Sequence, residues 1–506
     1  MSNHKMTLRL IAFCAAVLFF VGCIPEGSLT WSEDGSVGLL NIKNGLYLVD
    51  GETGELTELG VVAGSLPDIS KDGKVIAYCE QVSCDNLFEG FRRLPSNQVR
   101  MIKSYAEQMR KNILAAGELT DDRYGFPEEG LLTPKDYRNW AIRYLVENAD
   151  SELMNILDKE DIEKAKQRSI SYFQIVVAPR ENPAQRRVVT VSVFQILATQ
   201  LSPDAKHVAY LMHTQEGEVN NAYEEYGLYI ASVEGDTKAM YVDSRVAIGY
   251  DWRNDGQAIA YLNADSKDLL NDDLILGTLS EKVVMGAEGN LLAVPVDVPK
   301  SGSAGTHHCI GQKAELAGMA FYPWLKVEYG LDNRIFFSSL AMSMPVSKRD
   351  EAGCSLFCYD PVMGTVTDVL PLSVSSYTRQ QIIGLSLFSL SPDGKRVLLP
   401  IMHNRFIVYE LGTGSMDIPV PEEDGFGEEE IPELAPSWKG NREFSFLASE
   451  KSRLLYAGIK PREGQNGPDR REIIVMGKNP GKNSWRCRIL SRDWPDEMTF
   501  GTKDGR

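Results

Sequence analysis

The sequence predicts an all-β fold, a β-propeller of about seven blades with an α-helical insertion in the second blade. Three observations carry this prediction: a turn phrase recurs along the chain, a second strand and turn follow most copies, and one long interval has helical periodicity. The 506 residues could also form two or three average domains. The repeats favour one propeller over residues 29–495, followed by a C-terminal tail at 496–506.

The recurring phrase is a Ser or Trp, a turn with Asp-Gly or a near equivalent, and a short apolar strand. Its seven copies lie at or near Ser32, Ser70, Ser202, Trp252, Trp324, Ser391 and Trp438. Asp-Gly supplies the positive φ that a tight hairpin needs. Several intervals exceed the ~40–50 residues of a minimal blade, so the excess is insertion.

Most copies continue into a second strand, as at 45–50, 227–230, 355–360 and 406–410, and a more polar strand such as 186–191 closes several units. Four antiparallel strands per unit are typical of a propeller blade. Unrelated hairpins in a β-sandwich are the alternative, but a sandwich gives no reason for the phrase to return so often.

The largest insertion, at residues 86–171, has helical periodicity. Four helices are expected: one capped by Ser96 and ended by Gly117, one opened by Thr133-Pro134, and two shorter ones capped by Asp150 and Asp161. The insertion either covers one face of the propeller or presents a docking surface. Its aromatic residues are Phe88, Phe91, Tyr137, Trp140 and Tyr144. Aromatics at helical spacing are more often core than contact, yet this cap and the adjacent funnel are the preferred binding site.

The phrases "LSPDAKHVAY" at 201–210 and "LSPDGKRV" at 390–397 resemble the WD40-like repeats of the TolB type. The resemblance covers most of residues 27–490. It implies that the Ser or Trp and the Pro-Asp-Gly lie where the innermost strand of a blade turns into the second. The resemblance indicates the fold specifically but says little about the function.

The N-terminus has the pattern of a signal peptide at residues 1–22. Lys5 and Arg9 precede an apolar run from Leu10 to Val21, which is shorter than the ~20 apolar residues of a spanning helix. Phe20-Val21-Gly22-Cys23 resembles the lipobox of bacterial lipoproteins. The alternative is an ordinary secretory signal with an incidental cysteine.

The lipobox resemblance implies that Cys23 is lipidated and that residues 23–28 form a short tether to the propeller. Ile24 stands where many inner-membrane lipoproteins carry Asp, so the resemblance implies an outer-membrane anchor, most simply on the periplasmic face of the cell envelope. The expected partners are the membrane, through the lipid, and other envelope proteins.

The formal net charge is −17. Nucleic-acid affinity comes largely from Lys and Arg on phosphates, and anionic lipids also attract basic segments. The charge therefore argues against nucleic acid as a partner and against charge-driven binding to anionic lipid.

Cysteine and histidine give little sign of a site. Cys79 and Cys84 either close a small loop by a disulfide or stay free, whereas Cys354 and Cys358 lie about 13 Å apart in a predicted strand, too far to bridge. His307-His308-Cys309 is a weak metal candidate, since adjacent residues rarely all face one ion. The acidic stretches 265–273 and 422–430 are expected to be solvated loops rather than calcium sites. No metal, cofactor or catalytic residue is predicted.

Two functions follow. The first is a lipid-anchored envelope protein whose propeller is a non-catalytic module for protein binding or scaffolding. The alternative is an enzyme acting on glycans in the propeller funnel, a glycoside hydrolase or lyase, with carboxylates from different blades. Two buried carboxyls about 5–9 Å apart in the funnel favour glycosidase chemistry, and a dry or blocked funnel argues against it. The Gly-x-Ser-x-Gly elbow of serine hydrolases does not occur in the sequence.

Overall fold

The computed structural model describes residues 27–491 apart from the internal segments given next. These segments are 43–44, 62–65, 117–134, 158, 214–225, 236–238, 270–274, 287–290, 292–306, 310–318, 321–325, 341–353, 371–387, 402–404, 418–435, 450–470 and 479–484. The predicted signal peptide, the start of the tether and the C-terminal tail lie outside the described residues.

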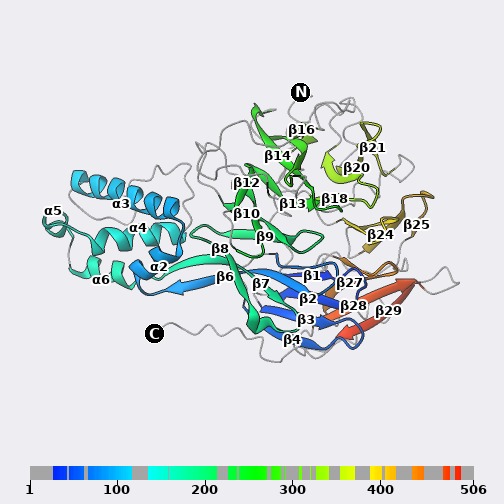
Figure 1. The fold of residues 1–506 in the computed structure, drawn as a ribbon, viewed down its shortest axis with the longest axis horizontal. Helices are drawn as coiled ribbons and strands as arrows, with labels where there is room; N and C mark the ends of the chain where they lie inside the picture. Colours follow the sequence, from blue (N-terminus) through cyan, green and yellow to red (C-terminus); the bar gives the residue numbers. More distant parts are fainter. Residues whose placement is uncertain are drawn as a thin grey trace, which may run out of the picture.

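The strands form seven antiparallel sheets, each a meander of four strands in chain order, with a fifth short strand in blade 4. Numbered in chain order, these sheets are blades 1 to 7 of a β-propeller (Figure 1). The first strands of the blades are β1 (Gly27–Trp31), β5 (Asp68–Ile69), β9 (Ile196–Leu201), β13 (Val246–Trp252), β18 (Val327–Tyr329), β22 (Ser389–Leu390) and β26 (Ser437–Lys439). They contact the first strands of neighbouring blades, as expected for strands lining a common axis.

The other strands follow outward from the axis. The second strands are β2 (Val37–Ile42), β6 (Val75–Cys84), β10 (His207–His213), β14 (Ala258–Leu269), β19 (Ile335–Leu340), β23 (Arg396–Ile401) and β27 (Glu443–Ser449). The third strands are β3 (Gly45–Asp50), β7 (Ile170–Pro179), β11 (Tyr226–Ser232), β15 (Ile275–Val283), β20 (Cys354–Asp360), β24 (Arg405–Glu410) and β28 (Arg471–Lys478). The outer strands are β4 (Leu56–Val61), β8 (Arg187–Ser192), β12 (Met240–Asp243), β16 (His307–Cys309), β21 (Thr365–Asp368), β25 (Met416–Asp417) and β29 (Trp485–Ser491), and β17 (Met319–Ala320) also pairs with β15.

The hydrophobic core is divided among the seams between blades. A separate apolar cluster fills each of the seven seams, including the seam between blades 7 and 1, where Trp31 and Leu40 meet Val475 and Leu490. Middle strands are therefore apolar on both faces, and every residue of β2 is buried. Because blades 1 and 7 each use only their own strands, apolar packing rather than strand exchange closes the ring.

The helical insertion lies between β6 and β7 of blade 2, as predicted. Its helices are α2 (Leu87–Arg93), α3 (Ser96–Ala116), α4 (Lys135–Glu147), α5 (Ser151–Met154) and α6 (Lys159–Gln167). Together they form the helical module, which stands at one side of the propeller and is joined to it by the long strands β6 and β7 (Figure 1). A single 3₁₀ turn, η2 (Pro183–Gln185), follows β7.

Several details of the helices and turns differ from the prediction. Asn86 caps an additional helix, α2, by accepting the N–H groups of Phe88 and Glu89. Asp150 caps α5 as expected, but Asp161 lies inside α6 and Ser96 is the first residue of α3, so neither lies before its helix as predicted. The fifth turn is formed by residues 330–334, so Tyr329 rather than Trp324 precedes it; Trp324 lies outside the described residues.

Candidate functional site

The recurring turn phrase forms one repeated structure. In four copies, Ser32, Ser70, Ser202 and Ser391, the hydroxyl donates to the Asp carboxylate two residues later at 2.7 Å. The same hydroxyl accepts the N–H group five residues later. In six blades, the residue three positions after the one that opens the turn has a positive φ. These residues are Gly35, Gly73, Ala205, Gly256, Asn333 and Gly394. Blade 7 differs, with Gly440 in a shorter turn.

Two adjacent positions on each inner strand link neighbouring blades. We call the first the latch position and the second the anchor position. The latch residues are Thr30, Asp68, Gln200, Asp251, Glu328, Ser389 and Ser437, and the anchor residues that follow them are Trp31, Ile69, Leu201, Trp252, Tyr329, Leu390 and Trp438.

At three seams a latch carboxylate accepts the backbone N–H group of the anchor residue in the next blade. These acid latches join Asp68 Oδ2 to Leu201 at 2.7 Å, Asp251 Oδ2 to Tyr329 at 2.7 Å, and Glu328 Oε2 to Leu390 at 2.6 Å. They hold blade 2 to 3, 4 to 5, and 5 to 6. Lys326 forms an ion pair with Glu328 and donates to Phe388 O at 2.8 Å across the last of these seams.

At three other seams the anchor residue is Trp, and its indole N–H donates to the preceding blade. These tryptophan latches run from Trp252 to Gln200 O at 3.3 Å, from Trp438 to Ser389 O at 2.9 Å, and from Trp31 to Ser445 Oγ at 2.7 Å. Where the next blade has an anchor Trp, the latch residue is Gln or Ser. Where it does not, the latch residue is Asp or Glu, except between blades 1 and 2, where Thr30 faces Ile69.

The latch and anchor residues form an inner belt around the axis, and Asp68 and Asp251 are carboxyl groups of this belt that lie largely enclosed. Burial raises the pKa of Asp68 to about 7, because the lowering effect of the Leu201 and Ile69 N–H groups is smaller. Burial likewise raises the pKa of Asp251 to about 6, against hydrogen bonds from Tyr329 and Gln200. Both side chains keep some accessible surface, as expected for a group on the wall of an internal channel. The negative charge of Asp251 further raises the pKa of Asp68.

Lys71 links the turns at the end of the axis where each inner strand leads into the second strand. It follows β5 of blade 2, and its Nζ donates to Asn254 Oδ1 in blade 4 at 3.1 Å, past the intervening blade 3. Asn254 in turn donates to Gly330 O in blade 5 at 2.8 Å, and Lys71 O accepts the Glu33 N–H group of blade 1 at 2.9 Å. The turns of four blades are therefore joined around this end of the axis.

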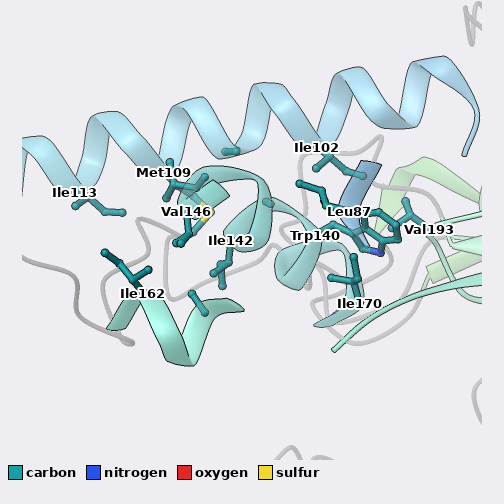
Figure 2. Close-up of a cluster of buried hydrophobic side chains, with 14 of the residues drawn as sticks. Leu87, Ile102, Met109, Ile113, Trp140, Ile142, Val146, Ile162, Ile170 and Val193 are labelled. Carbon is teal, nitrogen blue, oxygen red and sulfur yellow. The ribbon is translucent and has the colours of Figure 1, made fainter. Parts of the chain in front are cut away.

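The helical module has its own core and is fixed to blades 2 and 3. Trp140, fully buried, stacks on Phe91 with ring centroids 5.6 Å apart, and its indole N–H donates to Ser171 O of β7 at 2.7 Å. Figure 2 shows Trp140 beside Leu87 of α2 and Val193 of the link between blades 2 and 3. Its packing leaves no room at Gly90, where a Cβ would lie 2.1 Å from the Trp140 ring.

Polar contacts reinforce this attachment. Gln98 of α3 is buried; it donates to Ser192 Oγ at 3.1 Å and accepts the Val193 N–H group at 2.8 Å. Arg143 of α4 donates to the backbone oxygens of Lys166 and Asp85. The module is thus attached to the propeller by both apolar packing and hydrogen bonds. Its core reaches β7, β8 and the 193–194 link, with Met212 of blade 3 at its margin, and Figure 1 places it beside the ring.

The outer surface of the helical module carries an exposed aromatic residue and several cations. Phe88 of α2 is 54% exposed. Lys103 of α3 lies over the rings of Phe91 and Tyr144, 5.8 and 5.6 Å from their centroids. Residues 86–116 hold six Lys or Arg and two Glu, in a chain with a net charge of −17. The segment of α2 and α3 therefore differs in charge from the chain as a whole, although its Arg110 forms ion pairs with Asp150 and Glu152.

Several predicted site residues have no site role in the structure. Cys79 and Cys84 lie in the continuous strand β6 and are not joined by a disulfide, so the alternative of a disulfide between them is wrong. Their five-residue separation in extended chain is about 16 Å, beyond disulfide reach. Cys354 and Cys358 share β20, as expected. Cys23 lies outside the described residues.

The other candidates are partly described. His307–Cys309 forms the outer strand β16, and no cluster of three possible metal ligands occurs in the described part of the chain. Residues 265–269 belong to strand β14, so the prediction of a loop is wrong there; 270–273 and 422–430 lie outside the described residues. Among the helices that the structure describes, none has the length and apolar character to cross a membrane.

Sequence reasoning missed the latch residues, although a signal for them exists. Each latch residue lies two positions before the Ser, Arg, Gly or Lys that opens a turn, so aligning the copies of the phrase aligns Asp68, Asp251 and Glu328.

Comparison with known proteins identifies no family. No family model and no curated protein matches the chain. Solved structures similar to it include hydrazine synthase of Kuenenia stuttgartiensis, with 10% identity, 83% of this chain and 92% of that chain covered, and a TM-score of 0.42. An oligogalacturonate lyase of Vibrio parahaemolyticus has 12% identity, coverage of 78% and 77%, and a TM-score of 0.37. A putative TolB from Agrobacterium tumefaciens has 13% identity, coverage of 61% and 84%, and a TM-score of 0.32. These similarities concern the propeller fold alone.

Proposed function

We propose that this protein is a lipid-anchored scaffold of the bacterial cell envelope, held at the periplasmic face of the outer membrane through Cys23. Its propeller acts as a non-catalytic protein-binding module, and its partners are other envelope proteins. The helical module is the docking surface.

One observation carries the non-catalytic proposal: the carboxyl groups of the inner belt hold the blades together. Asp68, Asp251 and Glu328 each accept a backbone N–H group from the next blade. Leaving such a donor without a partner costs about 1–3 kcal/mol. A group that leaves its latch to bind substrate or transfer a proton would therefore weaken the ring.

The helical module supports the choice of docking surface. Phe88 is an exposed aromatic residue on a helix that is fixed to a rigid ring, and aromatic side chains dominate the binding energy of protein interfaces. The cations of α2 and α3, apart from Arg110, which pairs with Asp150 and Glu152, favour a partner with an acidic contact surface. Extra elements on a repeat scaffold are also common binding elements.

Affinity capture from native membranes tests this proposal. The full chain would carry a C-terminal tag, and Phe88→Ser would be compared with Val362→Ser, which changes an 88% exposed apolar residue on blade 5. We expect specific envelope proteins with the unmodified chain and with V362S, and at least tenfold less of them with F88S. Recovery of lipid alone, or equal capture by both variants, would refute docking at the helical module.

The lipid anchor at Cys23 has its own test. Metabolic labelling with a fatty-acid analogue should modify the unmodified chain, and Cys23→Ser should abolish the label. Label retained in C23S would show that Cys23 is not the acylated residue.

Glycan cleavage is the second candidate, and the Asp68 carboxyl favours it. A pKa of about 7 suits a general acid, as in glycosidases that pair a protonated with an ionised carboxyl. Asp68→Asn and Asp251→Asn should then abolish cleavage of envelope or plant-wall oligosaccharides, whereas Asp204→Asn, in an exposed turn, should not. Absence of products from a broad oligosaccharide panel with the unmodified protein would rule against this candidate.

A further inference from the structure

Two acidic residues from the blades on either side of blade 3 accept hydrogen bonds from two consecutive residues of its inner strand. Asp68 of blade 2 accepts the Leu201 N–H group, and Asp251 of blade 4 accepts from Gln200 Nε2 at 2.7 Å. Gln200 and Leu201 are consecutive residues of β9 in blade 3. The inner edge of blade 3 is thus clasped between two carboxyl groups within one enclosed belt.

We propose that this pair is a proton-operated clasp: with a proton on the pair it holds blade 3 firmly, and with both carboxyls ionised it loosens β9. The physical reason is chiefly that each enclosed carboxylate is poorly solvated, and the negative charge of Asp251 adds a smaller penalty at Asp68. A single proton removes one charge while the backbone N–H donor keeps an oxygen acceptor.

The charged surroundings do not cancel this cost of ionising the two carboxyls. Lys71, at the turn end, lowers the pKa of both carboxyls, but only as the smallest of the effects on each. On β18, Glu328 raises the pKa of Asp251, and Glu328 is itself paired with Lys326. Tyr250 stays neutral because burial raises its pKa well above the ordinary value, and it donates to Ala209 O at 2.9 Å. Burial also raises the pKa of Tyr329.

The direction of the pH effect follows from these shifts. Both carboxyls titrate higher in the folded chain than in the unfolded chain, so folding takes up protons between pH ~4 and ~7. The stabilisation is complete below the unfolded pKa of about 4 and is lost as the pH rises through about 6 and 7. The clasp should therefore be tighter at pH 5 than at pH 8.

Urea unfolding of the mature chain at pH 5 and pH 8 measures the effect. We expect the folded-to-unfolded ratio to fall on the order of tenfold or more between these values. In the double variant D68N/D251N, which keeps side-chain volume and an acceptor oxygen, the fall should be under about threefold. Asp204→Asn is the matched control in the turn of blade 3. Burial raises the pKa of Asp204, but hydrogen bonds from the Ser202 hydroxyl and the Lys206 N–H group outweigh it and lower the pKa overall. This residue therefore stays ionised over the whole interval, and D204N should keep the full dependence.

Hydrogen exchange in the unmodified chain keeps the proposal testable even where the double variant does not fold. Protection of the β9 amides, corrected for intrinsic exchange rates, should drop at least fivefold from pH 5 to pH 8, relative to β1 and β26 at the ring closure. Equal changes in β9 and the reference strands, or a double variant with the full pH dependence, would overturn the clasp.

Discussion

The seams of this propeller fall into two kinds that solve the same problem with different chemistry. An acid latch places a carboxylate on one blade and a backbone donor on the next, whereas a tryptophan latch places an indole donor on the second blade and an oxygen on the first. The tryptophan latch buries a large apolar ring as well as one hydrogen bond. The acid latch uses an acceptor that can be protonated, so the seams that involve Asp68 or Asp251 are expected to respond to pH.

The largest expected effect is at a tryptophan latch. Trp31→Ala removes a buried ring at the closing seam and should destabilise the protein by about 3–5 kcal/mol, measured by urea unfolding. Trp31→Phe keeps most of the packing and loses the hydrogen bond to Ser445, so it should cost less. A loss below about 1 kcal/mol for W31A would show that the closing seam does not depend on its latch.

An acid latch should depend on its acceptor rather than on its volume. Asp251→Ala leaves the Tyr329 N–H group and Gln200 Nε2 without their partner, which should cost about 1–3 kcal/mol. Asp251→Asn keeps an acceptor and should cost less at pH 7. Equal destabilisation in both variants would mean that the charge itself, rather than the acceptor, holds the seam.

The seam between blades 1 and 2 has no latch of either kind among the described residues; its apolar cluster and the hydrogen bond from Glu33 to Lys71 hold it, and the turn of blade 2 packs closely on blade 1. Gly73 has φ +69°, and a Cβ there would lie 2.8 Å from Val37 Cγ1. Gly73→Ala should therefore cost about 1–2 kcal/mol from the left-handed backbone alone, with the contact adding to it. Thermal unfolding of G73A that matches the unmodified chain would contradict this account.

The smallest effect is expected in blade 3, where Ala205 occupies the same turn position with φ 55°. Ala205→Gly relieves the left-handed strain but adds freedom to the unfolded chain at a cost of about 0.5–1 kcal/mol. The net result should be a stabilisation of less than about 1 kcal/mol, seen as a slightly higher midpoint in urea. A lower midpoint would show that the strain at Ala205 is already absorbed by its neighbours.

The blade number and the helical insertion were predictable because both leave local signals. Asp-Gly turns report a positive φ at one residue, and the spacing of Val99, Ile102, Met109 and Ile113 reports one buried helix face. The missed helix α2 is only seven residues long, too short for its periodicity to stand out. The expected Asp161 cap was wrong because α6 begins two residues earlier, at Lys159.

The sequence alone determined that the chain repeats, that the repeats are four-stranded, and that a helical segment interrupts the second one, since turns and periodicity are local properties of the backbone. Only the tertiary structure decided which residues meet across a seam. Asp68 and Leu201 are 133 positions apart, and Trp31 and Ser445 are 414 apart. Such pairs come together only when the ring closes, so the partners of the acid and tryptophan latches become visible only in the folded ring.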